Sequence, residues 1–175
     1  MPGDASVSNR YLVQSDYGMG ALLWWITAPS EEDILDTFAE VEIIRDDERI
    51  DLVSTGEGQP AEVAIEGPYP PGLDGLHEKR MRQRQEVGYG VLAGAERVYL
   101  KRPDPEDDGT VWYSELGSDG RRLREIERLA DGSATGYSQW IMNPPEDLRD
   151  PESAGFTCTA EEFESVWRSA TLIDD

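Results

Sequence analysis

The segment 104–115 carries the acid spacing of a twelve-residue calcium-binding loop. Positions 1, 3, 5 and 12 of such a loop are filled by Asp104, Glu106, Asp108 and Glu115, and a glycine stands at position 6. An EF-hand needs a helix on each side of its loop, whereas the flanking segments 98–100 and 112–116 are predicted strands. Because the chain has 37 acidic residues, chance matches are expected. The pattern therefore favours an exposed acidic hairpin loop, with a calcium or small-ligand site as the alternative.

The single histidine and the single cysteine are the other candidates for chemistry. His77 has no suitable partner in its local sequence, so a solvated histidine near a helix start is favoured over a general base, although a triad could still assemble in three dimensions. One cysteine, Cys158, precludes an intramolecular disulfide and any multi-cysteine metal site. Glu161 and Glu162 oppose formation of its thiolate. We expect no catalytic residue and no cofactor.

Charge is the strongest signal in the composition. The 175 residues include 16 Lys and Arg and 37 Asp and Glu, giving a net charge of −21. Residues 1–75 carry −13, residues 76–102 carry +4 and residues 103–175 carry −12. Such a field repels nucleic-acid phosphates and anionic lipids and accelerates encounter with basic proteins. The predicted partner is a basic protein, either a toxin or a nucleic-acid-binding protein, with no direct nucleic-acid or membrane binding.

Acidic clusters and two tryptophans are the candidate contacts for that partner. The predicted acidic contacts are Glu31, Glu32, Asp33, Asp36, Asp46, Asp47 and Glu48. Trp24 and Trp25 are neighbours on a predicted strand, so their side chains point to opposite faces. We expect other elements of the chain to cover both faces, and the alternative is that a partner covers one. Trp24 or Trp140 is the predicted aromatic anchor.

The amino-terminal half predicts a hairpin followed by a capped helix. Strands are predicted at 11–17 and 21–27, with a turn at 18–20 between them, and a further strand at 41–44. Ser30 can accept a hydrogen bond from the backbone of Asp33, which starts a helix there. The segment 45–60 is predicted to be a loop with a short strand at 50–53.

A basic helix is predicted at 76–87. It contains Lys79, Arg80, Arg82 and Arg84. We favour a helix that neutralises the protein's own acidic surface, and the alternative is a local recognition feature.

The carboxyl-terminal half predicts a meander and a closing helix. Strands are predicted at 97–101, 110–116, 121–129 and 133–140, although the apolar spacing of the third strand also suits a helix. One helical turn is predicted at 146–149. Thr159 and Glu162 form a capping box, and Phe163, Val166 and Trp167 follow at helical spacing.

Together these elements predict an α+β fold, with antiparallel sheets and helices packed on one face. We expect a single domain over 10–175, composed of two lobes, 10–75 and 95–172, joined by the basic helix 76–87, with a frayed amino terminus at 1–9. The longest apolar run, 21–26, is too short for a membrane span, and no secretory signal is apparent. The expected location is the cytoplasm.

The segment 110–168 resembles a module of an uncharacterised bacterial family. The similarity is carried by the run 111–127, by Ala-Asp-Gly at 130–132, by Asn-Pro-Pro at 143–145 and by the closing helix that ends in Phe-Glu-x-x-Trp at 163–167. The resemblance implies a meander followed by a closing helix, and some relatives look like toxin-immunity or small accessory proteins. The predicted function is therefore a non-enzymatic acidic protein-binding module, an immunity or inhibitor protein that covers a basic partner.

Overall fold

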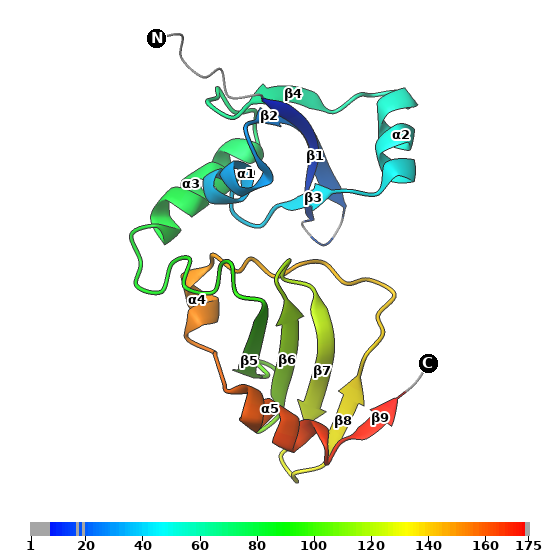
Figure 1. The fold of residues 1–175 in the computed structure, drawn as a ribbon, viewed down its shortest axis with the longest axis vertical. Helices are drawn as coiled ribbons and strands as arrows, with labels where there is room; N and C mark the ends of the chain where they lie inside the picture. The colour runs from blue at the N-terminus through cyan, green and yellow to red at the C-terminus, as the bar shows by residue number, and fades with distance from the viewer. Residues whose placement is uncertain (1–7, 17, 19, 174–175) are drawn as a thin grey trace. The chain divides into compact units, whose positions relative to one another are not determined.

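The computed structural model describes residues 8–16, 18 and 20–173, which form an α+β fold (Figure 1). The chain divides into two compact units between Gln85 and Glu86, and each unit is built on one mostly antiparallel sheet. Residues 1–7 of the predicted frayed terminus, and Tyr17 and Met19 at the predicted turn, lie outside the described residues. Asn9, at the end of that predicted terminus, already belongs to the first strand.

The sheet of the first unit has the strand order β3-β1-β2-β4. Its strands are β1 (Asn9–Asp16), β2 (Ala21–Ala28), β3 (Glu42–Ile44) and β4 (Ala61–Ala64). The predicted hairpin is present, with Leu12 opposite Trp25 in the antiparallel β1–β2 pair. β4 pairs with β2 in parallel and was not predicted.

Helices cover both faces of this sheet (Figure 1). On one face, Val13, Trp24 and Ile26 pack in a core with residues of α1 (Glu31–Thr37) and α3 (Leu73–Gln83). On the other face, Leu12, Trp25 and Ile44 pack against Ile50 and Val53 of α2 (Asp47–Thr55). The expectation that helices pack on one face is therefore wrong for the first unit, because the alternating side chains of β1 and β2 are apolar on both sides.

Helix α2 replaces the loop and short strand predicted at 45–60. The Asp46 carboxylate accepts a hydrogen bond of 2.8 Å from the backbone N–H of Arg49, which caps the helix. Asp47 and Glu48 then occupy the first turn, where the helix dipole favours negative charge. Ile50 and Val53 are three residues apart and reach the sheet together, so the apolar spacing that suggested a strand is helical.

Helix α3 covers most of the predicted basic helix 76–87 and belongs to the first compact unit. It starts at Leu73, which is fully buried in the same core as Phe38, the C-cap residue of α1. Two of its basic side chains bind carbonyl oxygens at the end of α1: Arg80 Nη2 donates to the Phe38 oxygen at 2.9 Å, and Arg84 Nη2 donates to the Asp36 oxygen at 2.6 Å. Cations at a helix C-terminus complement its dipole, and α1 has no basic residue in its own last turn.

The sheet of the second unit has the strand order β5-β6-β7-β8-β9. Its strands are β5 (Arg97–Pro103), β6 (Val111–Gly117), β7 (Arg122–Arg128), β8 (Ala134–Tyr137) and β9 (Thr171–Ile173). The first four form the predicted antiparallel meander, and β7 is a strand, which settles the ambiguous spacing at 121–129. β9 pairs with β8 in parallel and was not predicted.

Helix α5 (Ala160–Trp167) packs on one face of the second sheet. The Thr159 side chain accepts a hydrogen bond of 3.1 Å from the backbone N–H of Glu162, and Phe163 is fully buried against Tyr113 and Ile126. The ring of Trp167 comes so close to β8 that a Cβ on Gly136 would lie 2.9 Å from it. The helical turn predicted at 146–149 is absent, and a short helix, α4 (Pro151–Ala154), follows instead, with Asp150 as its N-cap.

Across the residues that the structure describes, no helix combines the length and the apolar character needed to cross a membrane.

Candidate functional site

The outward side of α2 presents three exposed carboxylates and one exposed leucine. Asp47, Glu48 and Asp51 are exposed, and so is Leu52, of which 72% is accessible. Since Ile50 and Val53 face the sheet, these four side chains point away from it. We call Asp47, Glu48, Asp51 and Leu52 the α2 acidic face.

The carboxylates of the α2 acidic face are not neutralised by ion pairs in the described part of the chain. Within the described ranges, no basic side chain forms an ion pair with Asp47, Glu48 or Asp51. Arg49, the cation of this helix, donates from Nη2 to the side-chain oxygen of Gln14 on β1. Asp47 and Asp51 stand four residues apart, a spacing at which like charges repel each other across a helix turn. The face is therefore an unsatisfied source of negative potential.

The acidic residues of α1 are more involved in local structure. Glu31 forms an ion pair with Arg45, in which Arg45 Nε lies 3.1 Å from Glu31 Oε1. The Ser30 hydroxyl donates to Asp33 at 2.5 Å, beside the predicted cap in which Ser30 accepts from the Asp33 N–H at 3.2 Å. Glu32 is exposed and Asp36 is half-buried. The Glu31–Arg45 pair brings the start of α1 next to the segment that leads into α2.

Two members of the α2 acidic face, Asp51 and Leu52, were absent from the predicted contacts. They were missed because 45–60 was predicted to be a loop. The signal was present in the sequence, since Asp47 and Asp51, and Glu48 and Leu52, are each four residues apart and so share one face of a helix.

The two predicted aromatic anchors have different environments. Trp24 is only 4% exposed in the core between the first sheet and its helices, so it is not an accessible anchor. Trp25 is equally buried on the opposite face, under the guanidinium of Arg10, which lies 3.8 Å from its ring. Trp140 is half-buried beside Arg122, whose guanidinium carbon lies 5.1 Å from the ring centre. Trp140 is thus the one predicted anchor that reaches the surface.

The segment 104–115 does not gather its acidic side chains. Asp104 accepts hydrogen bonds from the backbone N–H of Glu106 at 2.8 Å and from the indole of Trp112 at 2.9 Å, and the second of these is the main reason that its pKa is lowered. Glu115 lies on β6, buried beside Arg124 Nε at 2.5 Å. Asp108 and Glu106 are exposed in the loop between β5 and β6. In the described part of the chain, no group of three or more His, Cys, Asp or Glu residues could hold a metal ion.

His77 and Cys158 have structural surroundings. The His77 Nδ1 lies 3.1 Å from the Thr37 carbonyl oxygen, and its ring centre lies 4.8 Å from that of Tyr69. Burial, and then the charge of Glu162, raise the pKa of the Cys158 thiol, which favours the protonated and unreactive form.

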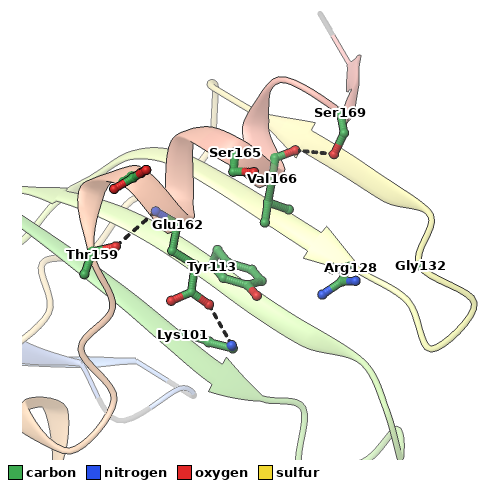
Figure 2. Close-up of a pocket in the computed structure, with 10 residues that line it drawn as sticks. Lys101, Tyr113, Arg128, Gly132, Thr159, Glu162, Ser165, Val166 and Ser169 are labelled. Atoms are coloured by element: carbon green, nitrogen blue, oxygen red, sulfur yellow. Dashed lines mark hydrogen bonds and ion pairs between the residues drawn. The ribbon is translucent and has the colours of Figure 1, made fainter.

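The second unit contains an open pocket of about 570 Å³ between its sheet and α5 (Figure 2). Sheet residues Lys101, Tyr113 and Arg128 form one side, and Glu161, Glu162 and Ser165 are among the helix residues on the other. None of them was predicted as a site residue, because they come from three strands and a helix that only the fold brings together.

Comparisons of the chain with protein-family models, with curated proteins and with solved structures find no match. The resemblance of segment 110–168 to an uncharacterised bacterial family therefore stays a prediction, and the function is argued from the surfaces themselves.

Proposed function

We propose that this protein is a non-enzymatic binding module whose acidic surface covers a basic region of a partner protein. The observation that carries the proposal is the α2 acidic face, which presents an exposed leucine and three carboxylates that form no ion pair with the residues the structure describes. A lysine- or arginine-rich surface complements both the sign of this charge and its local self-repulsion.

Charge and apolar contact have separate roles in such an association. The carboxylates raise the rate of encounter and select against acidic partners, but exposed ion pairs contribute only about 0–1 kcal/mol each. Burial of a leucine side chain contributes about 1.5–3 kcal/mol, so Leu52 supplies affinity beside the carboxylates. Trp140 is the proposed anchor on the second unit, because it reaches the surface beside the exposed residues Ile141 and Met142.

Within this class we favour an immunity or inhibitor protein, whose partner is a toxin or another nucleic-acid-binding protein. Proteins that bind nucleic acid carry the cationic surface that this module complements. The net charge of −21 also makes the module repel nucleic acid, with which it would compete for the partner's cationic surface.

Affinity capture from native lysate tests the proposal. Three baits are compared at low and high salt: the wild type, the variant Asp47→Asn/Glu48→Gln/Asp51→Asn, and a matched control, Glu96→Gln/Glu106→Gln/Asp108→Asn, which removes the same charge from exposed positions in the second unit. We expect a basic protein to be retained at low salt by the wild type and the control, and to be lost from the α2 variant. Equal retention by all three baits, or loss from both variants, contradicts the role of α2.

A further inference from the structure

The pocket of the second unit is independent of the proposed protein-binding surface. Its volume of about 570 Å³ lies within the range of small-molecule sites. Lys101 of β5, Tyr113 of β6 and Arg128 of β7 rise from one face of the sheet toward α5 (Figure 2). Register places Lys101 directly opposite Tyr113, and Arg128 opposite Val111, two residues before Tyr113 on the same face of β6.

One pair of charges in the pocket is already neutralised. Lys101 Nζ donates to Glu162 Oε1 at 2.7 Å, and the pKa of Lys101 is raised by Glu162 first and by the Tyr113 hydroxyl second. This pair forms the middle of the pocket, where the Tyr113 ring and Val166 also add apolar surface (Figure 2).

Two opposite charges in the pocket have no ion-pair partner among the residues that the structure describes: the Arg128 guanidinium and the Glu161 carboxylate. Arg128 ends β7, close to the turn at Gly132, whereas Glu161 stands in the first turn of α5, two residues after its N-cap Thr159. Figure 2 shows Arg128 and Thr159 on opposite sides of the Tyr113 ring. The pocket therefore has a cation without an ion pair on its sheet side and a carboxylate without an ion pair on its helix side, among the described residues.

We infer that this pocket binds a small zwitterion that carries a carboxylate at one end and a protonated amine at the other. The planar guanidinium of Arg128 matches a carboxylate in a two-pronged hydrogen bond. The Glu161 carboxylate and the Ser165 hydroxyl accept from the ammonium group, and the Tyr113 ring and Val166 contact the aliphatic chain between the two ends.

Net charge selects the zwitterion over simpler ions. A ligand with net negative charge is opposed by Glu161 and by the field of a chain with net charge −21. A ligand with net positive charge leaves Arg128 uncompensated. A molecule with both charges pairs with Arg128 and with Glu161, and because its net charge is zero, the negative field of the chain does not oppose its entry.

Titration of the isotope-labelled protein, followed by amide NMR shifts, tests the inference. The probes are the zwitterions 4-aminobutyrate, 6-aminohexanoate and 8-aminooctanoate, each compared with the acid and with the amine of the same chain length. We expect at least one zwitterion to give saturable shifts at Gly132, Ser165 and Val166 and to bind at least ~10-fold more tightly than either single-charge analogue. Such a ligand can be a short peptide or a free amino acid, and triglycine distinguishes these two sources. Tighter binding of triglycine than of the best aminoalkanoate indicates a peptide, and weaker binding indicates a free amino acid.

Matched variants assign the two ends. Arg128→Gln and Glu161→Gln change exposed residues, and each is expected to weaken binding of the best zwitterion by roughly tenfold or more. The controls Arg168→Gln and Glu152→Gln remove the same charges from exposed positions of the second unit that do not line the pocket. The inference is overturned, whatever the variants show, if none of the zwitterions saturates the shifts up to ~50 mM. It is also overturned if a single-charge analogue binds as tightly as the zwitterion of the same length. Equal losses in the controls overturn it as well.

Discussion

The two units carry almost the same net charge but use their basic residues differently. Residues 1–85 include 17 acidic and 7 basic residues, and residues 86–175 include 20 acidic and 9 basic residues, for net charges of −10 and −11. In the second unit the cations pair with carboxylates along the sheet, as in the contacts of Arg102 with Glu146 and of Arg124 with Glu115 and Glu164. In the first unit, Arg10, Arg45 and Lys79 also form ion pairs, but Arg80 and Arg84 bind backbone carbonyl oxygens at the end of α1.

This difference explains why the proposed interface lies on α2. Helix α3 packs on the opposite face of the sheet from α2, and its Arg80 and Arg84 bind carbonyl oxygens at the end of α1, so neither arginine neutralises the carboxylates of α2. Asp47, Glu48 and Asp51 then keep their full negative potential, although the first unit is no more acidic than the second. Net charge alone therefore does not locate a binding surface, because what matters is which carboxylates lack a cation.

The largest expected effect concerns the buried arginine of the first unit. Arg80 is 1% exposed and hydrogen-bonds to the Phe38 carbonyl and to Gln83. Arg80→Ala leaves those acceptors without their donor and opens a cavity, so we expect a loss of about 3 kcal/mol in the free energy of unfolding. Urea unfolding measures it. Arg82→Ala, at an exposed position of the same helix, is the control and should change stability by less than about 0.5 kcal/mol. Equal effects would show that α3 does not use Arg80 in this way.

The corresponding change in the second unit is Arg124→Met. Arg124 contacts the buried Glu115 and lies 5.0 Å from the ring centres of Phe163 and Trp167. Its removal takes the closest cation from Glu115 but leaves Arg97 at 3.6 Å, so we expect a smaller loss, about 2 kcal/mol. Arg128→Met, on the same strand but exposed, is the control for urea unfolding. A loss larger than that of Arg80→Ala would reverse the comparison between the units.

An acid-dependent contribution is expected from Glu164. Hydrogen bonding to Arg124 lowers its pKa below the ordinary value of a glutamate. The pair therefore adds stability at pH above the pKa of Glu164 in the unfolded chain, and this contribution is lost as pH falls through the lower folded pKa. Since the Glu164 side chain is 41% exposed, the effect should stay below about 1 kcal/mol. Comparing urea unfolding of wild type and Glu164→Gln at neutral and acidic pH measures it, and an equal difference at both pH values would contradict the account.

The smallest expected effect is on the stability of the first unit when α2 is neutralised. In Asp47→Asn/Glu48→Gln/Asp51→Asn the repulsion between Asp47 and Asp51 disappears, but favourable dipole interactions of the first turn are lost too. We expect thermal unfolding to change by no more than a few tenths of a kcal/mol in free energy. A large loss would mean that these carboxylates stabilise the fold instead of being available for binding.

Local patterns in the sequence predicted much of the fold. The capped helix after Thr159, the Ser30 cap and the meander of the second unit are confirmed, because each depends on neighbours within a few residues. The parallel strands β4 and β9 were missed, since they are three or four residues long, and β9 has no buried residue. Their pairing depends on the position of distant strands.

The candidate surfaces were predicted less completely than the fold. The acids at 46–48 were named from composition, but the role of Asp51 and Leu52 needed the knowledge that α2 is a helix. The sequence did not show whether Trp24 is a buried core residue or an exposed anchor, because it does not show that helices cover both faces of the first sheet. The pocket of the second unit depends on strand register, which no local pattern specifies.

The most direct test of the central claim is to map where a cationic probe binds. Decalysine is titrated into the isotope-labelled protein at low salt, and amide NMR shifts are followed in both units. We predict the largest shifts at residues 47–55, weakened by added salt and by Asp47→Asn/Glu48→Gln/Asp51→Asn, but retained in Glu96→Gln/Glu106→Gln/Asp108→Asn. Shifts spread evenly over the two units, or reduced equally by both variants, would contradict the claim that α2 is the surface that meets a basic partner.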